Sequence, residues 1–435
     1  MERLYVAVIC LLLAACQPLS ANPGASPKPR ATASPSPTVV ITSPTTLPAP
    51  IPSLIPSLET TTNPDLLDES MFVTTLPSGA RPTPIPQPPL LHSALILLAG
   101  SDTPGFQDGQ GEQAKFNKPL GISLDGQGNI FVADSGNHAI RKVSSDGNVS
   151  TIAGTGQPGN KEGQAKQAQF IYPNRLIIDN ADNVFVLEYL DSNSIDKTEN
   201  RILRRIRKID KKNNVSTINL NNKSILNKYI SNIYFHKDSN QIYINSNNEI
   251  FSILEENQVT QIANQEKFSL KNSGLLDAAQ KSSFLSGSSN FYGFREEPNI
   301  DGLVIGKKNH IFVLDVYRKL VWKIDSEGES SVFIGGGQFF QLSTWDACDY
   351  YSRFFNVSRL SLGFQENIYM IDKTFIRQIS SDGCSTTLKI QEKTGGAASV
   401  LSLKVSDLVV DYKGILYILS ENKVYKLDLN ARAAS

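Results

Sequence analysis

Short apolar runs alternate with turn residues along most of the chain. In the clearest stretch, residues 119–154, four apolar runs occupy residues 121–124, 129–133, 139–143 and 149–153. Clusters of Gly, Asp, Asn and Ser separate these runs. Short runs bounded by such residues are typical of antiparallel strands joined by tight turns. The pattern therefore predicts a meander of four strands.

This four-strand unit recurs down the chain. The second runs of successive units align on one apolar residue each, and the third runs follow in register. The aligned residues are Ile130, Val184, Ile242, Ile311, Ile368 and Leu416. Self-similarity of this kind indicates a repeat architecture. Six units of four strands predict an all-β fold, a six-bladed β-propeller of four-stranded antiparallel blades.

The two ends of the repeat region complement each other. The sixth unit lacks a fourth run after residues 424–427, and residues 94–99 (ALILLA) look like the missing fourth strand. We expect residues 94–99 to pair with residues 424–427 and so to close the ring. Closure removes the unpaired edge that an incomplete last blade would leave.

The residues that precede the repeats differ in composition. Eighteen of the 23 prolines fall between residues 17 and 92, together with many Ser, Thr and Ala. Such a segment cannot bury enough apolar surface to offset the entropy of ordering it, and its prolines favour extended chain. The sequence therefore predicts a disordered Pro/Ser/Thr-rich tether over residues 16–92 and a propeller domain over residues 93–435.

The first residues are typical of a secretory signal peptide. Arg3 precedes a short apolar run, and small residues follow that run. Residues 13–16 read LAAC and resemble the lipobox of bacterial lipoproteins. The resemblance implies that residues 1–15 are removed and that Cys16 is lipidated. We therefore expect a lipid anchor in the bacterial cell envelope, at the outer membrane or cell surface if two membranes are present. An ordinary signal peptide with an incidental cysteine is the alternative.

The first unit contains four motifs of a known repeat family. They are GNIFVAD, NHAIRKV, GNVSTIAG and the preceding loop GFQDGQGEQAKFNKP, which recurs before the second unit as GQPGNKEGQAKQAQFIYP. These motifs resemble NHL repeats. The resemblance weakens in later units, where only strand cores remain. It implies a β-propeller of the NHL type over roughly residues 93–430.

Charge and histidines limit the chemistry. The chain has 42 basic and 42 acidic residues, and this balance argues against a nucleic-acid partner, which usually requires a basic excess. His138, His236 and His310 fall in different units and at different strand positions. No converging trio that could bind a metal is visible, so we interpret the three as structural.

Acidic residues recur where second strands end. Asp134, Glu188, Asp315 and Asp372 occupy this position. They could direct carboxylates at a metal or a sugar, but an Asp here more often accepts hydrogen bonds from the backbone of its own loop. We favour the structural interpretation.

Two cysteines remain in the propeller domain, Cys348 and Cys384. Two are too few for a disulfide scaffold. One bridge could form in an oxidising compartment. The repeat alignment, however, places the two in different types of loop, and this argues against pairing.

Three insertions interrupt the repeats, at residues 188–200, 264–298 and 335–355. Loops on a rigid scaffold often carry function. In a four-stranded meander all three would emerge on one face, which we predict to be the binding surface. The third insertion supplies its candidate residues, Phe339, Phe340, Trp345, Tyr350 and Tyr351. Packing of these aromatic rings between blades is the alternative.

The sequence thus favours a binding scaffold over an enzyme. The expected partners are the membrane, through Cys16, and a protein, peptide or glycan of the envelope, without a cofactor. The alternative is a metal-dependent lyase or lactonase-like hydrolase, with calcium or zinc in the central channel. A propeller fold does not choose between these functions, because it hosts many.

Overall fold

The computed structural model of the chain describes residues 90–91, 94–189, 204–220, 225, 228–255, 258–269, 298–336, 346–348, 352–390, 399–400 and 403–431. All of them lie in one compact unit, Asp68–Ser435. Apart from short 3-10 turns, their regular structure is strand, which confirms the all-β prediction. Among these residues, no helix has both the length and the apolar character needed to cross a membrane.

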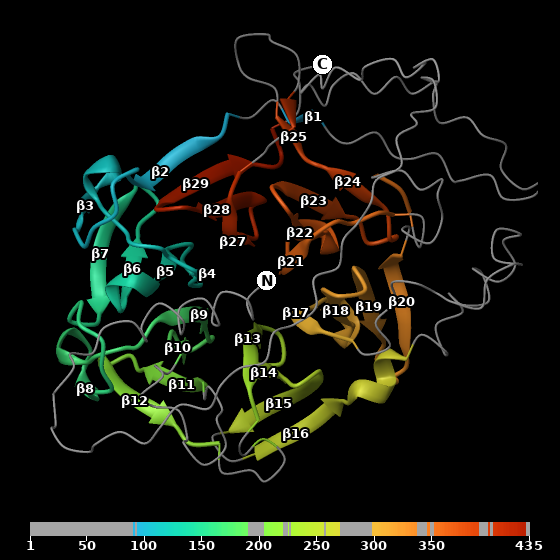
Figure 1. The fold of residues 1–435 in the computed structure, drawn as a ribbon, viewed down its shortest axis with the longest axis horizontal. Coiled ribbons are helices and arrows are strands. Elements are labelled where there is room, and N and C mark those ends of the chain that lie inside the picture. Colours follow the sequence, from blue (N-terminus) through green and yellow to red (C-terminus); the bar gives the residue numbers. More distant parts are fainter. Residues whose placement is uncertain are drawn as a thin grey trace, which may run out of the picture. The chain divides into compact units, whose positions relative to one another are not determined.

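Six antiparallel sheets surround a common axis as the blades of a propeller (Figure 1). The first strand of each blade lies nearest the axis, and later strands lie farther out. Blade 1 comprises β4 (Gly121–Leu124), β5 (Ile130–Asp134), β6 (Ala139–Val143) and β7 (Asn148–Ala153), with β3 (Gly109–Gln110) on its outer edge. Blade 2 comprises β9 (Pro173–Ile178), β10 (Val184–Tyr189), β11 (Arg204–Ile209) and β12 (Asn214–Ile218), with β8 (Gly163–Gln164) outermost.

The next blades have four strands each. Blade 3 comprises β13 (Ile230–His236), β14 (Gln241–Ser246), β15 (Glu249–Glu255) and β16 (Gln258–Ala263). Blade 4 comprises β17 (Ile300–Ile305), β18 (Ile311–Asp315), β19 (Leu320–Ile324) and β20 (Ser330–Gly335). Blade 5 comprises β21 (Val357–Leu362), β22 (Ile368–Asp372), β23 (Phe375–Ile379) and β24 (Ser385–Thr387). Together with a sixth sheet, formed by both ends of the repeat region, these blades confirm the predicted six-bladed propeller.

Both ends of the repeat region meet in blade 6, which comprises β27 (Val405–Val410), β28 (Ile415–Ser420), β29 (Lys423–Asp428) and the N-terminal β2 (Ile96–Gly100). Strand β2 pairs antiparallel with β29, and Leu97 lies opposite Tyr425. This pairing confirms the predicted closure of the ring. A small separate sheet is formed by β1 (Leu90–Leu91), β25 (Lys389–Ile390) and β26 (Ser399–Val400).

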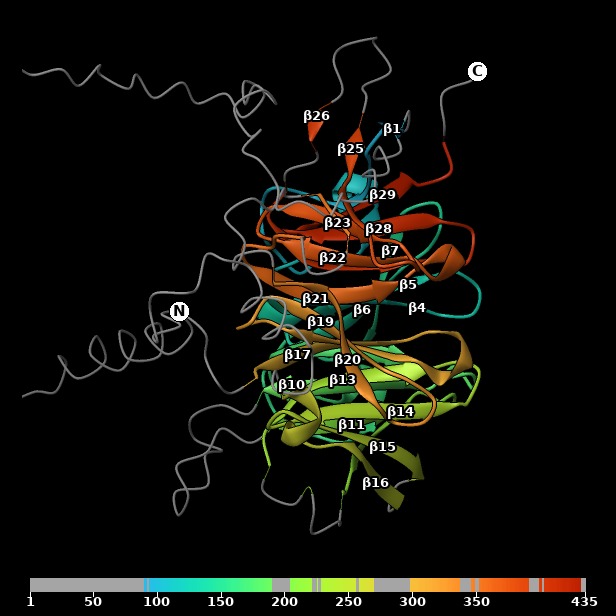
Figure 2. The same cartoon turned by 90° about the vertical axis from the view of Figure 1, so that its right-hand side faces the viewer.

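The hydrophobic core is divided among the blade boundaries. Six clusters of buried side chains each join one blade to the next, and the last joins blade 6 to blade 1. The second strands β5, β18 and β22 are buried along their whole length, because they pack against a neighbouring blade on both faces. Seen from the side, the strands run across the thickness of the ring (Figure 2). The short 3-10 turns lie between strands: η3 (Gly111–Gln113), η4 (Ser135–Asn137), η5 (Ala165–Gln167), η7 (Gln265–Phe268), η10 (Lys307–Asn309) and η13 (Phe364–Glu366).

A glycine ends the outer strand of three blades for a steric reason. Gly100, Gly154 and Gly335 have φ angles of +96°, +100° and +106°. A Cβ atom at each would lie 2.2–2.6 Å from a backbone carbonyl oxygen at the start of the third strand. Only glycine adopts this backbone conformation without strain. The shared geometry explains why the segment before Gly100 resembles the fourth strand of the first unit.

A disulfide joins Cys348 to Cys384, which corrects the expectation drawn from the repeat alignment. The connection into blade 5 runs along the outer edge of that same blade, where Ser385 N donates a hydrogen bond to Ala347 O at 2.7 Å. The connections into blades 1 and 2 do the same through β3 and β8. The two loop types are therefore neighbours in space, although they are separate in the repeat.

Candidate functional site

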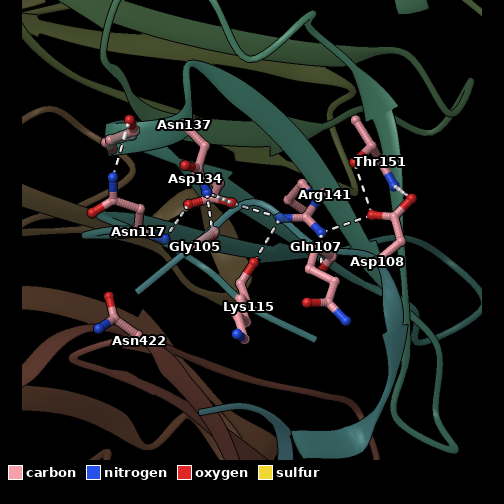
Figure 3. Close-up of polar contacts among 12 residues, drawn as sticks. Gly105, Gln107, Asp108, Lys115, Asn117, Asp134, Asn137, Arg141, Thr151 and Asn422 are labelled. Carbon is pink, nitrogen blue, oxygen red and sulfur yellow. Dashed lines mark hydrogen bonds and ion pairs between the residues drawn. The ribbon is translucent and has the colours of Figure 1, made fainter. Parts of the chain in front are cut away.

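The carboxylates at the ends of second strands are held inside the blades. Asp134 accepts hydrogen bonds from Asn117 N at 2.8 Å, from Asn137 Nδ2 at 2.8 Å and from Arg141 Nη1 at 2.7 Å. The other side of the Arg141 guanidinium pairs with Asp108 Oδ1 at 2.7 Å (Figure 3). Burial raises the pKa of Asp134 to about 6, and these partners oppose the rise. The arrangement fastens the incoming connection to blade 1.

Other blades repeat this arrangement. In blade 5, Arg377 Nη2 lies 3.1 Å from Asp346 Oδ1, and Thr387 Oγ1 donates a hydrogen bond to the same oxygen. In blade 2, Glu188 pairs with Arg205 Nε at 2.6 Å and with Arg207 Nη1 at 3.4 Å.

The two remaining acids act in the same way. Asp315 Oδ1 accepts hydrogen bonds from Asn299 N and Arg318 N, both at 3.1 Å. Asp372 Oδ1 accepts hydrogen bonds from the backbone N–H groups of the two residues that precede β21 by one and two positions, both at 2.9 Å. Each of the four acids thus holds its own blade and its connections, as the sequence predicted.

The three histidines lie in separate blades, also as predicted. His138 Nδ1 accepts a hydrogen bond from Tyr172 N at 3.1 Å, and His236 Nδ1 lies 2.8 Å from Ser239 Oγ. Burial lowers the pKa of both. Within the described ranges, no group of three or more His, Cys, Asp and Glu side chains could hold a metal ion.

The residues predicted to bind a ligand or a lipid lie outside the described residues. This applies to Phe339, Phe340, Trp345, Tyr350 and Tyr351 in the third insertion and to Cys16 at the N-terminal end. Their proposed roles therefore stay predictions.

A cavity lies on the propeller axis, a position that the sequence suggested only for the metal-dependent alternative. Its volume is about 620 Å³, and all six first strands line it. Most of these strands contain a β-bulge near their beginning. A bulge redirects side chains and often marks a functional position.

One position of the first strands forms a ring around this channel. It immediately precedes a large aliphatic residue in each strand, and it is occupied in blade order by Gly121, Arg175, Asn232, Gly302, Arg359 and Asp407. All of these residues except Gly121 line the cavity. The ring therefore contains two arginines, an asparagine and an aspartate, and Asp301 lies next to it in β17. We call these five polar residues the channel cluster.

The carboxylates of the channel cluster surround Arg359. Arg359 Nη1 lies 3.2 Å from Asp301 Oδ2, and Arg359 Nε lies 4.0 Å from Asp407 Oδ1. Asp407 also accepts hydrogen bonds from Ile122 N of blade 1 at 3.1 Å and from Leu408 N at 3.0 Å. Burial raises the pKa of Asp407, and the positive charge of Arg175 offsets part of that rise.

Blade 3 contributes polar groups that support Asp301. Asn232 Nδ2 and the hydroxyl of Tyr234 donate hydrogen bonds to Asp301 O at 2.9 and 3.0 Å. Burial raises the pKa of Tyr234 well above its usual value, so this hydroxyl keeps its proton and remains a donor. This hydrogen bond therefore orients the Tyr234 hydroxyl toward blade 4.

Arg175 has a different environment. Its side chain is buried, and Nη1 donates hydrogen bonds to Leu120 O at 2.6 Å and Asn174 O at 2.9 Å. Its Nε is buried and has no hydrogen-bond partner. Among the described residues, no Asp or Glu forms an ion pair with it.

A signal for the channel cluster was present in the sequence. Aligning the first strands, instead of the second, places Arg175, Arg359 and Asp407 at the position that Gly121 holds in the clearest unit. Charged residues in a short apolar strand are unusual and indicate a functional or paired role. The alignment alone does not show that ring closure brings these aligned positions of separate strands to one channel.

Comparison with known proteins places a family repeat in blade 1. Residues 116–143, which include β4 to β6, match the NHL repeat. Over 72 residues, 16% of this chain and 10% of the relative, the chain is 43% identical to the human NHL repeat-containing protein 2. Over 119 residues, 24% of this chain and 11% of the relative, it is 34% identical to the chloroplastic protein SUPPRESSOR OF QUENCHING 1 of Arabidopsis thaliana. The chain thus spans about a tenth of the length of these curated relatives.

The fold as a whole is found in solved structures. An auxiliary nutrient binding protein from Bacteroides ovatus has a TM-score of 0.52 with this chain, at 11% sequence identity, over 78% of this chain and 76% of the other. At that identity the similarity shows the fold alone. The molecule is therefore a six-bladed β-propeller with an NHL repeat in its first blade.

Proposed function

We propose that this protein is a binding scaffold whose ligand enters the central channel and contacts the channel cluster. The observation that carries the proposal is the cavity of about 620 Å³ with charged side chains of several blades at one level. Concave sites with a few converging polar groups are the usual form of ligand pockets. A volume of this size accommodates a small molecule or the terminal residue of a peptide or glycan.

The surroundings of the channel support this proposal. Two of the predicted insertions, residues 264–298 and 335–355, run directly into β17 and β21. They therefore end beside Asp301 and Arg359, on the face where the first strands begin. We propose that the aromatic residues of the second of these insertions, Trp345 and Tyr350 among them, form the rim of the site. The similarity in fold to an auxiliary nutrient binding protein is consistent with such a role.

We further propose that the propeller acts at the bacterial cell envelope. Lipidation of Cys16 would anchor the chain, and the proline-rich residues 17–92 would hold the propeller away from the membrane. A small ligand captured outside the cell fits this placement. The chain would then act as a surface or periplasmic receptor without chemistry of its own.

A thermal-shift screen of the purified chain tests the binding role. The panel contains monosaccharides, amino acids, short peptides and organic acids, each acid paired with its amide or neutral analogue. A ligand that binds only the folded state raises the melting temperature in a concentration-dependent manner. We expect at least one such compound, with a smaller shift for Trp345→Ala/Tyr350→Ala. A panel that leaves the melting temperature unchanged contradicts the proposal.

A further inference from the structure

We propose that the ligand of the channel carries a carboxylate group and that this group binds Nη2 of the Arg175 guanidinium. The inference rests on the proposed function, because it names the chemistry of the ligand that the same channel would hold. It assigns to Arg175 a role in addition to its hydrogen bonds to the backbone at Leu120 and Asn174.

The burial of Arg175 without an anion is exceptional in this molecule. Five arginines are buried among the described residues, and four of them pair with a carboxylate: Arg141, Arg207, Arg318 and Arg377. Arg175 is 7% exposed and forms no such pair within the same part of the chain. Asp407 lies near enough to interact electrostatically with Arg175 but makes no ion-pair contact with it, and burying a charge without a contacting counterion is costly. A ligand anion would supply the missing partner.

The hydrogen bonds of Arg175 leave Nη2 of the guanidinium available to a ligand. Both carbonyl contacts, to Leu120 O and Asn174 O, use Nη1. Nε has no partner, and Nη2 donates no hydrogen bond to the described residues. Nε is itself buried, so a ligand can reach this edge only through Nη2, whose N–H groups can donate a charge-assisted hydrogen bond to a carboxylate oxygen. The backbone carbonyls meanwhile hold the side chain in place.

The opposite side of the channel selects the charge of the ligand. Blades 2 and 5 lie across the ring from each other (Figure 1), and in blade 5 Arg359 lies between Asp301 and Asp407. Two arginines and two aspartates give the channel cluster little net charge. A monoanion therefore gains the Arg175 contact without strong repulsion, whereas a phosphate dianion would be repelled by both aspartates. This asymmetry favours a carboxylate over a phosphate.

Isothermal titration calorimetry on the full purified chain tests the inference. The probes are glucuronate against glucose, phenylacetate against phenylacetamide, every acid that the screen identifies against its neutral analogue, and inorganic phosphate. A charge-assisted hydrogen bond should favour at least one acid over its neutral analogue by about 10- to 100-fold in Kd. Equal affinity within the pairs, or tighter binding of phosphate, overturns the inference.

Variants of Arg175 then locate the effect. Arg175→Gln should remove the preference for the acid, while Lys211→Gln, which neutralises an exposed cation in the turn between β11 and β12, should retain it. Arg175→Lys keeps the charge without the forked edge and should lose part of the preference, which provides a second test if the glutamine variant does not fold. An unchanged preference in either Arg175 variant contradicts the assignment.

The two proposals fail in different ways. If no compound of the panel and no probe binds, the channel is not a ligand site and the proposed function fails. If compounds bind but neutral analogues bind as well as acids, the binding function stands and only the carboxylate assignment fails.

Discussion

Arg359 Nη1 lies 3.2 Å from Asp301 Oδ2, across the boundary between blades 5 and 4. The two residues are 58 positions apart in the chain. On its other side, Arg359 approaches Asp407 of blade 6. The Arg359 side chain thus links the first strands of blades 4, 5 and 6 at the wall of the channel. It both stabilises the ring and shapes the candidate site.

The ion pair between Arg359 and Asp301 predicts a modest effect on stability. Because both side chains are partly exposed, Asp301→Asn should lower the free energy of unfolding by about 1 kcal/mol. Urea denaturation measures the change, and a double-mutant cycle with Arg359→Gln isolates the pair. The exposed pair of Lys404 and Glu421 is the matched control, and Glu421→Gln should have almost no effect. Equal losses at both sites would show that the channel pair is an ordinary surface pair.

Because β2 closes the ring, a charged substitution on its buried face should strongly lower the stability of the fold. Ala99 is fully buried between blades 6 and 1, whereas Ile96 in the same strand is 49% exposed. Ala99→Asp should destabilise the fold by more than about 3 kcal/mol, because it buries an unpaired charge. Ile96→Asp is the control and should be tolerated. Deleting residues 94–99 should likewise lower the melting temperature sharply. If the deletion melts like the wild type, the strand does not close the ring.

The disulfide predicts a dependence of stability on redox conditions. Cys348 and Cys384 are 36 positions apart, and cross-linking a loop of that length stabilises a fold by about 4 kcal/mol in the chain-entropy model. Reduction with dithiothreitol should therefore lower the melting temperature of the wild type. The same treatment should leave Cys348→Ser/Cys384→Ser unaffected. Insensitivity of the wild type would mean that the two thiols are not joined.

Glu188 predicts that stability depends on pH. Burial raises its pKa from 4.5 to about 7, although Arg205 and Arg207 partly oppose the rise. The folded chain therefore binds the proton more tightly than the unfolded chain, so the contribution of this group is complete below pH 4.5 and is lost as pH rises to about 7. Unfolding free energies measured between pH 4.5 and 8 should fall by up to about 3 kcal/mol from this source. Glu188→Gln cannot titrate, and its pH profile should be flatter. Parallel profiles would contradict the assignment to Glu188.

The anchor predicts where the protein is found in cell fractions. Cys16→Ser removes the thiol that the lipobox resemblance marks for acylation, so the variant should leave the membrane fraction. Cys10→Ser, in the apolar run before it, provides the control and should remain membrane-bound. Immunoblots of the two fractions measure this. A Cys16→Ser protein that still sediments with membranes would falsify the anchor.

The fold was readable from the sequence because its elements are local. Each blade is a meander whose strands lie next to each other in the chain, so apolar runs and turn residues identify it. The closing strand was predictable for a related reason, since residues 94–99 and the segment that ends at Ala153 share the glycine that must follow them. Asp134 and its equivalents could also be interpreted, because their partners lie in their own blade and its connections.

Contacts between distant segments were decided only by the tertiary structure. The alignment argued against pairing of Cys348 and Cys384, because it could not show that a connection returns along the outer edge of its own blade. The channel cluster likewise depends on contacts between segments that are distant in the chain. Arg175, Arg359 and Asp407 are ordinary charged residues of three separate strands until ring closure brings those strands to one axis. Local periodicity fixes which segments become blades, whereas the shared channel, and with it the burial of Arg175 beside that channel, exists only once six blades have packed.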